Sequence, residues 1–158
     1  MVRTGIGWDV HPLVEGAELH LGCLHFPDAE KGLKGHSDAD VVCHAICDAL
    51  LGAAALGDIG DYFPDTDPEF EGCPGSKLLE RVRDMVAEKG YRIVNVDCTV
   101  MSDAVRLGPK KKDMARTVAS HLGLRPDEVC VKATTWEGHG AVGRGEVIAC
   151  EAIATVRR

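Results

Sequence analysis

Residues 5–11, Gly-Ile-Gly-Trp-Asp-Val-His, constrain the fold most strongly, because small and apolar side chains alternate along them. A period of two predicts a β-strand, in which side chains two residues apart lie on one face. We therefore expect a strand over residues 2–9, with Asp9 and His11 pointing the same way near its end. A carboxylate and an imidazole on one strand face are chemically active groups, so this segment also marks a candidate site.

The rest of the chain alternates between helix and strand patterns. Apolar residues recur with helical spacing in three stretches, two of which end at Gly90 and Gly123. The predicted helices cover residues 41–55, 76–89 and 109–121, and the further strands cover residues 18–26, 91–101, 129–136 and 147–156. Residues 27–37 and 57–74 are expected to be loops, and loops as long as the second are usually functional or mobile. We expect an α/β (α+β) fold, a single domain over residues 1–158 with helices packed on one face of a mixed β-sheet.

Composition limits the class of protein. The 158 residues are 45% hydrophobic and 27% charged, which is typical of one soluble globular domain. Aromatic residues make up only 4%, so Ala, Val, Leu and Ile must form the core. The formal net charge of -7 argues against a nucleic-acid partner, which selects for a basic surface. A site for an anionic substrate would need local positive charge from metal ions, helix N-termini and a few cations.

The sequence also predicts a compartment. No stretch approaches the ~20 apolar residues that span a bilayer, and the first residues lack a signal-peptide core. Seven cysteines are scattered without a C-x-x-C pair, which is the pattern of neither a disulfide framework nor a zinc–cysteine site. We expect a cytoplasmic protein with no membrane partner. Reduced cysteines such as Cys98 and Cys130, which lie in apolar runs, would pack as small hydrophobic residues.

Asp9 and His11 gain significance from His44, which lies in the predicted helix 41–55. One carboxylate and two imidazoles suit a divalent transition metal, with zinc as the best match. Three protein ligands would leave one tetrahedral position open, as in catalytic zinc sites. Taken singly, a strand-end Asp commonly caps a turn, and a helix histidine commonly has an ordinary structural hydrogen bond. The metal interpretation gains weight from the further polar clusters beside these residues.

A second cluster is His36-Ser37-Asp38-Ala39-Asp40. Ser37 stands three residues before Asp40, close to a capping box, which predicts a helix start here. A helix N-terminus with free N–H groups can bind an anion, and His36 and Ser37 would add hydrogen-bond donors. A plain capping motif explains Ser37 and Asp40 equally well, but it leaves His36 without a role.

A third cluster gathers hydroxyls, a carboxylate and two cations after the predicted strand at 129–136. Its members are Lys132, Thr134, Thr135, Glu137 and Arg144. Hydroxyls can bind phosphoryl oxygens, and a lone carboxylate can hold a magnesium ion that bridges two phosphates. The structural alternative is a glycine-rich hairpin with exposed polar side chains.

A fourth cluster lies in the loop 57–74. Its members are Asp58, Ile59, Gly60, Phe63, Pro64, Asp65, Thr66 and Asp67. Acidic side chains accept hydrogen bonds from hydroxyls, so the loop suits a polyol better than a phosphate, although the same residues also favour turns. Together the four clusters form an inventory for phosphoryl chemistry, in which catalysis is mostly positioning and charge neutralisation.

Seven stretches match a known family in the right order. They are residues 7–11, 34–41 with His44, 48–60, 63–68, 95–97, 132–135 and 143–146. Over essentially its whole length, the chain thereby resembles the 2-C-methyl-D-erythritol 2,4-cyclodiphosphate synthase family of the non-mevalonate isoprenoid pathway. The resemblance implies a lyase that cyclises 4-diphosphocytidyl-2-C-methyl-D-erythritol 2-phosphate, with attack of the 2-phosphate on the β-phosphorus and release of CMP.

The resemblance also implies an assembly and roles for the clusters. The family is homotrimeric with active sites at subunit interfaces, and zinc would lie on the Asp9, His11 and His44 side chains. Magnesium or manganese on Glu137 would bridge the α and β phosphates. His36 and Thr135 would stabilise the transition state. The remaining members of the second, third and fourth clusters would bind the substrate, with the loop 58–67 contacting the erythritol.

The sequence departs from the family in places. Trp8 replaces a usual Phe, and Ala39 replaces a frequent Gly at what we expect to be a tolerant helix start. Residues 102–108 lack the Gln/Glu-x-Pro-Lys pattern beside the cytosine, and Ala141 replaces a ring near the trimer axis. Two alternatives therefore stay open. One is another metal-dependent phosphoryl-transfer or phosphodiester enzyme, and the other is a non-catalytic trimeric scaffold, against which the complete set of metal ligands argues.

Overall fold

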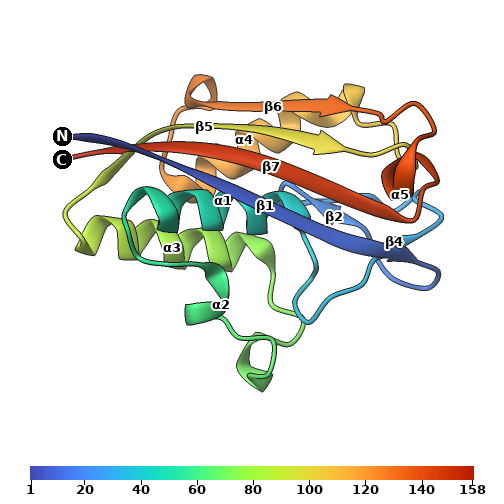
Figure 1. Ribbon diagram of the computed structural model, residues 1–158, viewed down its shortest axis with the longest axis horizontal. Coiled ribbons are helices and arrows are strands. Elements are labelled where there is room, and N and C mark those ends of the chain that lie inside the picture. The colour runs from blue at the N-terminus through green and yellow to red at the C-terminus, as the bar shows by residue number, and fades with distance from the viewer.

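A five-stranded mixed sheet forms the frame of the molecule in a computed structural model that describes residues 1–158 (Figure 1). Its strands are β1 (Val2–Val14), β4 (Gly32–Leu33), β5 (Arg92–Met101), β6 (Val129–Thr134) and β7 (Val147–Arg157). Their order is β4-β1-β7-β5-β6, with β5 and β6 parallel and all other neighbours antiparallel. A separate hairpin pairs β2 (His20–Leu21) with β3 (Leu24–His25).

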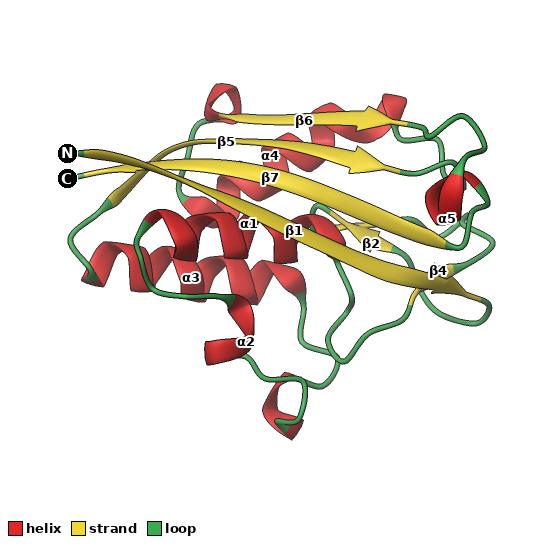
Figure 2. Ribbon diagram, viewed as in Figure 1, coloured by secondary structure: helices red, strands yellow, loops and turns green.

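Three long helices pack on one face of this sheet (Figures 1 and 2). They are α1 (Val41–Ala53), α3 (Gly75–Glu88) and α4 (Lys111–Leu122). The short helices are α2 (Ile59–Tyr62), α5 (Gly140–Gly143), η1 (Pro68–Phe70), η2 (Gly108–Lys110) and η3 (Pro126–Glu128). Helix α4 provides the crossover that the parallel pair β5–β6 requires. The predicted single α/β domain with a mixed sheet is confirmed.

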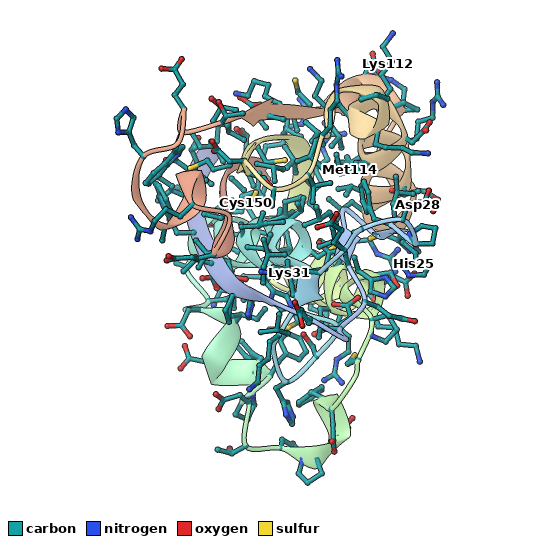
Figure 3. The ribbon with its side chains drawn as sticks, turned by 90° about the vertical axis from the view of Figure 1, so that its right-hand side faces the viewer. His25, Asp28, Lys31, Lys112, Met114 and Cys150 are labelled. Atoms are coloured by element: carbon teal, nitrogen blue, oxygen red, sulfur yellow. The ribbon has the colours of Figure 1, made fainter.

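The core lies between the sheet and the helices, and aliphatic side chains dominate it. Helix α4 contributes Met114, Val118 and Leu122, all buried on the face that the spacing predicts, and Figure 3 shows Met114 beneath the helix. Helix α3 contributes Leu79 and Val82 in the same way. The low aromatic content is thus compensated by tightly packed small and branched side chains.

The glycines of β1 explain how α1 reaches the sheet. A Cβ atom on Gly5 would overlap the carbonyl oxygen of Ala49, and one on Gly7 would overlap the carbonyl oxygen of Ala45. Because neither glycine has a side chain, the α1 backbone lies directly against the strand. This close approach brings His44 of α1 beside the polar end of β1.

One strand prediction and one loop prediction need correction. Residues 18–26 form a short hairpin instead of one strand, because Gly22 and Cys23 both have positive φ (58° and 65°) and turn the chain back on itself. The loop 57–74 contains α2 and η1, whose first turns are capped by aspartates. Strand β1 also extends to Val14, so His11 lies within the strand.

The start of α1 differs from the predicted capping box. Asp40, not Ser37, is the N-cap: its carboxylate accepts hydrogen bonds from the backbone N–H groups of Val42 and Cys43. It also accepts from Gly22 and Cys23 in the hairpin turn. The four N–H donors explain how a fully buried carboxylate is tolerated. Asp40 therefore occupies the helix N-terminus that we expected to bind an anion, and that prediction is wrong.

Ala39 is likewise not part of the helix. Its φ of 57° lies in the left-handed region, which explains why glycine suits this position and corrects the expectation of a tolerant helix start. The opposite face of the sheet carries exposed apolar side chains, including Ile6, Trp8 and Val10 of β1 and Ile153 of β7. None of the helices is long and apolar enough to cross a membrane.

Candidate metal centre and substrate cleft

Three predicted ligands converge where β1 meets α1. Asp9 Oδ2 lies 2.9 Å from His11 Nε2 and 3.1 Å from His44 Nδ1. The two imidazole nitrogens are 3.3 Å apart. Alternation along β1 places Asp9 and His11 on the helix-facing side, and the glycine contacts described above bring His44 to them. The structure thus brings His44 of α1 to two donors of β1 that lie 33 and 35 residues before it in the sequence.

The far nitrogen of each histidine ring has its own partner. His11 Nδ1 lies 3.1 Å from the carbonyl oxygen of Lys34, which can only accept, so this nitrogen carries the proton. His44 Nε2 lies 3.0 Å from Ser37 Oγ, which can accept from it in the same way. With a metal bound, the other nitrogen of each ring would be without its proton and could donate its lone pair to the ion. Such outer contacts orient metal-binding histidines and fix their tautomers.

The donor set fits a transition-metal ion. Two ligands that both lie about 2.0–2.1 Å from one tetrahedral ion are about 3.3 Å apart, close to the distances between these three atoms. One oxygen and two imidazole nitrogens favour zinc among the common divalent ions. The cluster can therefore hold a metal with three protein ligands and an open position.

The ionisation of Asp9 fits this role. Burial alone would raise the pKa of Asp9, but hydrogen bonds from His11 and His44, together with their charges, lower it far below the ordinary value. Burial would likewise lower the pKa of His11, but the hydrogen bond and charge of Asp9 raise it above the ordinary value. The cluster is therefore an electrostatically coupled unit with an anionic carboxylate at its centre.

A cleft of about 480 Å³ opens beside the cluster. Its lining includes Asp9, His11, Gly35, His36, Ser37, His44, Ile59, Gly60, Phe63, Pro64, Asp65, Phe70 and Leu78. His36 is fixed there by a 2.7 Å contact between Nε2 and the carbonyl oxygen of Asp67. The second and fourth sequence clusters thus meet the metal cluster at one cleft.

Not all members of the fourth cluster reach this cleft. Asp58, Thr66 and Asp67 are absent from its lining. The carboxylate of Asp58 caps α2 by accepting from the N–H of Asp61, and that of Asp67 caps η1 by accepting from Glu69. For Asp58 and Asp67 the turn interpretation is therefore confirmed.

Asp48 is a residue of this site that sequence reasoning missed. Its Oδ1 accepts a 2.7 Å hydrogen bond from the backbone N–H of Ile59, so α1 holds the α2 segment against the cleft. The sequence signal that could have identified Asp48 is the presence of a carboxylate within an otherwise apolar helix.

The third cluster lies elsewhere. Lys132 Nζ is 2.7 Å from Asp97 Oδ2, and Arg144 Nε is 2.8 Å from Glu146 Oε1. Thr134 and Thr135 are exposed after β6, and the exposed Glu137 has a positive φ of 51°. These side chains line no part of the cleft beside Asp9.

Strand register explains this separation. Asp9 pairs with Cys150, Cys150 with Val100, and Val100 with Ala133, so β6 lies three strand spacings, about 14 Å, from β1. Lys132 belongs to the neighbouring row of cross-strand pairs. That row includes Trp8, whose side chain is exposed on the face of the sheet opposite the helices. Lys132 and Thr134 therefore face away from the helices, whereas Asp9 and His11 face toward them. We call the Asp9 cleft the metal half-site and the Thr134–Glu137 segment the loop half-site.

Asp103 organises the loop half-site, and sequence reasoning missed this role. One carboxylate oxygen accepts a 2.7 Å hydrogen bond from the N–H of Trp136, and the other accepts a 3.0 Å bond from Gly138. Asp103 thus ties residues 102–108 to the segment that carries Thr135 and Glu137. A larger cleft of about 690 Å³ borders Ala104, Val105 and Arg106 on another side, away from the metal half-site.

Comparison with known proteins agrees with this architecture. The model of the YgbB family matches residues 2–157. A curated relative from Laribacter hongkongensis, 2-C-methyl-D-erythritol 2,4-cyclodiphosphate synthase, is 54% identical over 99% of this chain and 96% of its own length. A relative of the same name from Desulfatibacillum aliphaticivorans is 51% identical over 97% of this chain and 98% of its own.

Solved structures give the same result. The CDP complex of IspF from Plasmodium falciparum superposes with a TM-score of 0.84 at 28% identity, covering 98% of this chain and 95% of that one. The match spans both half-sites, because it includes nearly every residue of the sheet. The chain belongs to the YgbB family, the family of the 2-C-methyl-D-erythritol 2,4-cyclodiphosphate synthases.

Proposed function

We propose that this chain converts 4-diphosphocytidyl-2-C-methyl-D-erythritol 2-phosphate into 2-C-methyl-D-erythritol 2,4-cyclodiphosphate and CMP. An oxygen of the 2-phosphate forms a new bond to the β-phosphorus. The bond between that phosphorus and the oxygen bridging to the α-phosphorus breaks, and CMP leaves with the bridging oxygen. No water enters the products, so the step is an elimination of CMP by cyclisation, as in a phosphorus–oxygen lyase.

The convergence of Asp9, His11 and His44 at a cleft carries the proposal. These side chains would hold zinc, which when bound supplies positive charge that polarises a phosphoryl oxygen. Ser37 and the Lys34 carbonyl keep both rings oriented, so the ligands are preorganised. This arrangement supplies the local positive charge that a chain with net charge -7 needs for a phosphorylated substrate.

The cleft residues would place the sugar and the attacking phosphate. His36 lies in the cleft with one nitrogen held by the Asp67 carbonyl, so its ring is fixed where it can donate to a phosphoryl oxygen or restrain the nucleophile. Asp65 and the backbone of Ile59 and Gly60 border the same space and suit the hydroxyls of the erythritol. Asp58, although engaged in a cap, keeps further lone pairs for a substrate hydroxyl.

The loop half-site would bind the diphosphate from the other side. The Thr135 hydroxyl would stabilise the transition state, and Glu137 would hold magnesium or manganese. The Glu137 carboxylate has no hydrogen bond or ion pair within the chain, so it would be free to hold a cation that neutralises charge on the diphosphate. Lys132, Thr134 and Arg144 add donors around the nucleotide, and residues 102–108 would contact the cytosine.

The separation of the half-sites supports a homotrimer with shared active sites. Because β6 lies about 14 Å from β1, and its Lys132 and Thr134 face away from the helices, the loop half-site of one chain would serve the metal half-site of a neighbouring copy better than its own. The open sheet face offers Ile6, Trp8, Val10 and Ile153 for such a contact, and exposed apolar patches of this kind mark interfaces. Closed rings of identical chains use one surface on each copy to meet a different surface on the next.

The direct test is phosphorus NMR of the purified protein with the proposed substrate, zinc and magnesium. We expect CMP and the cyclic diphosphate to appear in equal amounts. CMP accompanied by an open-chain diphosphate would mean hydrolysis, and would favour the alternative of a different phosphodiester enzyme. Metal-loaded protein without turnover would favour the scaffold alternative.

A further inference from the structure

A second group of metal-type ligands lies on the β2–β3 hairpin, outside the proposed active site. His20 and His25 are paired across the hairpin, and their rings stack with centroids 4.9 Å apart and planes 19° apart. Glu18 Oε2 lies 3.1 Å from His20 Nε2. One ligand atom from each of the three residues lies within 4.8 Å of the others. Figure 3 shows His25 at the rim of the molecule.

The hairpin that presents these side chains is firmly anchored. Its turn residues Gly22 and Cys23 donate N–H bonds of 2.9 and 2.8 Å to the buried carboxylate of Asp40. Thr117 of α4 donates a 2.6 Å bond to the carbonyl oxygen of Gly22. Two helices therefore hold the turn, and the positions of His20 and His25 opposite each other do not depend on their own contact.

An ordinary ion pair explains only part of the group. An ion pair between a protonated His20 and Glu18 accounts for the 3.1 Å contact, but it gives His25 no role. Two stacked imidazoles repel each other when both are protonated and can share a cation when both are neutral. Two imidazoles and one carboxylate are also the donor set that zinc, copper(II) and nickel(II) favour.

We propose that Glu18, His20 and His25 form a second transition-metal site, separate from Asp9, His11 and His44. A modest rotation of the exposed Glu18 and His25 side chains would bring the three donors to bonding distance, because neither is packed in the core. Unlike the metal half-site, this group has no partner that orients His25. Its affinity is therefore lower, and the bound metal exchanges with solvent.

The test compares zinc bound per chain by equilibrium dialysis, with zinc free at micromolar concentration and metal measured by mass spectrometry. The wild-type protein is compared with His25→Ala, which leaves the His20–Glu18 pair intact. His121→Ala is the matched control, because His121 also contacts a glutamate, Glu80, at 2.8 Å but has no second histidine beside it. Circular dichroism melts establish that all three proteins are folded.

We expect His25→Ala to bind about one zinc fewer per chain than wild type, and His121→Ala to bind as much as wild type. Because Glu137 can also bind a cation, the result is the difference in zinc bound between the variants. The total zinc bound per chain does not test the proposal. With the first site filled by zinc, copper(II) added to wild type should give an electron paramagnetic resonance spectrum with coupling to two nitrogens, and this coupling should fall to one nitrogen in His25→Ala. Equal zinc binding by wild type and His25→Ala, or an equal loss in His121→Ala, would overturn the proposal.

Discussion

The metal half-site and the loop half-site are built in contrasting ways. Asp9, His11 and His44 are partly buried, contact one another and have outer partners that fix their orientation. Thr135 and Glu137 are exposed, and only Asp103 and short local contacts hold their segment. One chain thus supplies all three candidate metal ligands but leaves the loop half-site open. The difference shows that the first half is preorganised within the chain, and it fits the proposal that another copy completes the surroundings of the second.

The largest effect is expected when the metal half-site loses a ligand. His44→Ala leaves two ligands and removes the contact to Ser37, so tight zinc binding should disappear. Because the metal supplies several kcal/mol of charge stabilisation, kcat/KM should fall by about 10³-fold or more. Zinc content by mass spectrometry and a CMP-release assay check this. A variant that retains one tightly bound zinc per chain would show that His44 is not a ligand.

The contact between β1 and α1 can be disturbed without touching a ligand. Gly7→Ala places a Cβ against the carbonyl oxygen of Ala45, so helix and strand must move apart. We expect a loss of about 3 kcal/mol in the free energy of unfolding, measured by denaturant titration, together with weaker zinc binding.

Gly108→Ala is the matched control, since nothing lies within 4 Å of a Cβ at Gly108. Its unfolding free energy should stay within about 0.5 kcal/mol of wild type. If Gly7→Ala were as stable as Gly108→Ala, close packing of α1 on β1 would not be what positions His44.

The outer partner of His44 tests preorganisation more finely. Ser37→Ala removes the acceptor for His44 Nε2 while leaving all three ligands in place. Loss of such a contact should weaken zinc binding about 10-fold, which competition with a chromophoric chelator can measure. Unchanged affinity would mean that packing alone orients the His44 ring.

The smallest effect is expected in the loop half-site of the isolated chain. Asp103→Ala removes two hydrogen bonds to exposed N–H groups, which water can replace, so thermal stability should change little. The loop then positions Thr135 and Glu137 less well, and kcat/KM should fall about 5-fold with zinc affinity unchanged. A parallel loss of zinc would contradict the independence of the two half-sites within one chain.

The local sequence predicted helices and strands well where a single periodicity of apolar residues determined the structure. The alternation in β1 and the helical spacing in α3 and α4 gave strands and helices within a few residues. Strand β1 runs five residues beyond the expected end. Pro12 lacks an N–H and would ordinarily weaken strand pairing, but it still pairs with Val147. Cys130 was expected to pack in the core, but it is exposed, because its side chain lies on the open face of the sheet.

The sequence was least informative where partners are distant along the chain. Asp40 caps α1 and also binds the turn at Gly22 and Cys23, which no local capping pattern encodes. The role of Asp103 likewise depends on residues 33 and 35 positions away. The candidate ligands Asp9, His11 and His44 were recognisable by residue type. Their separation from the loop half-site could be seen only from the register of four strands.

The most direct test of a shared active site is complementation between two inactive variants. His44→Ala lacks the metal half-site and Glu137→Gln lacks the loop half-site, and the two are co-expressed with different tags and purified through both. If each active site joins half-sites from two chains of a trimer, every trimer that carries both tags has one intact site in three, and about one third of wild-type turnover should return. Activity no greater than that of either variant alone would contradict the account, because it would mean that one chain must supply both halves.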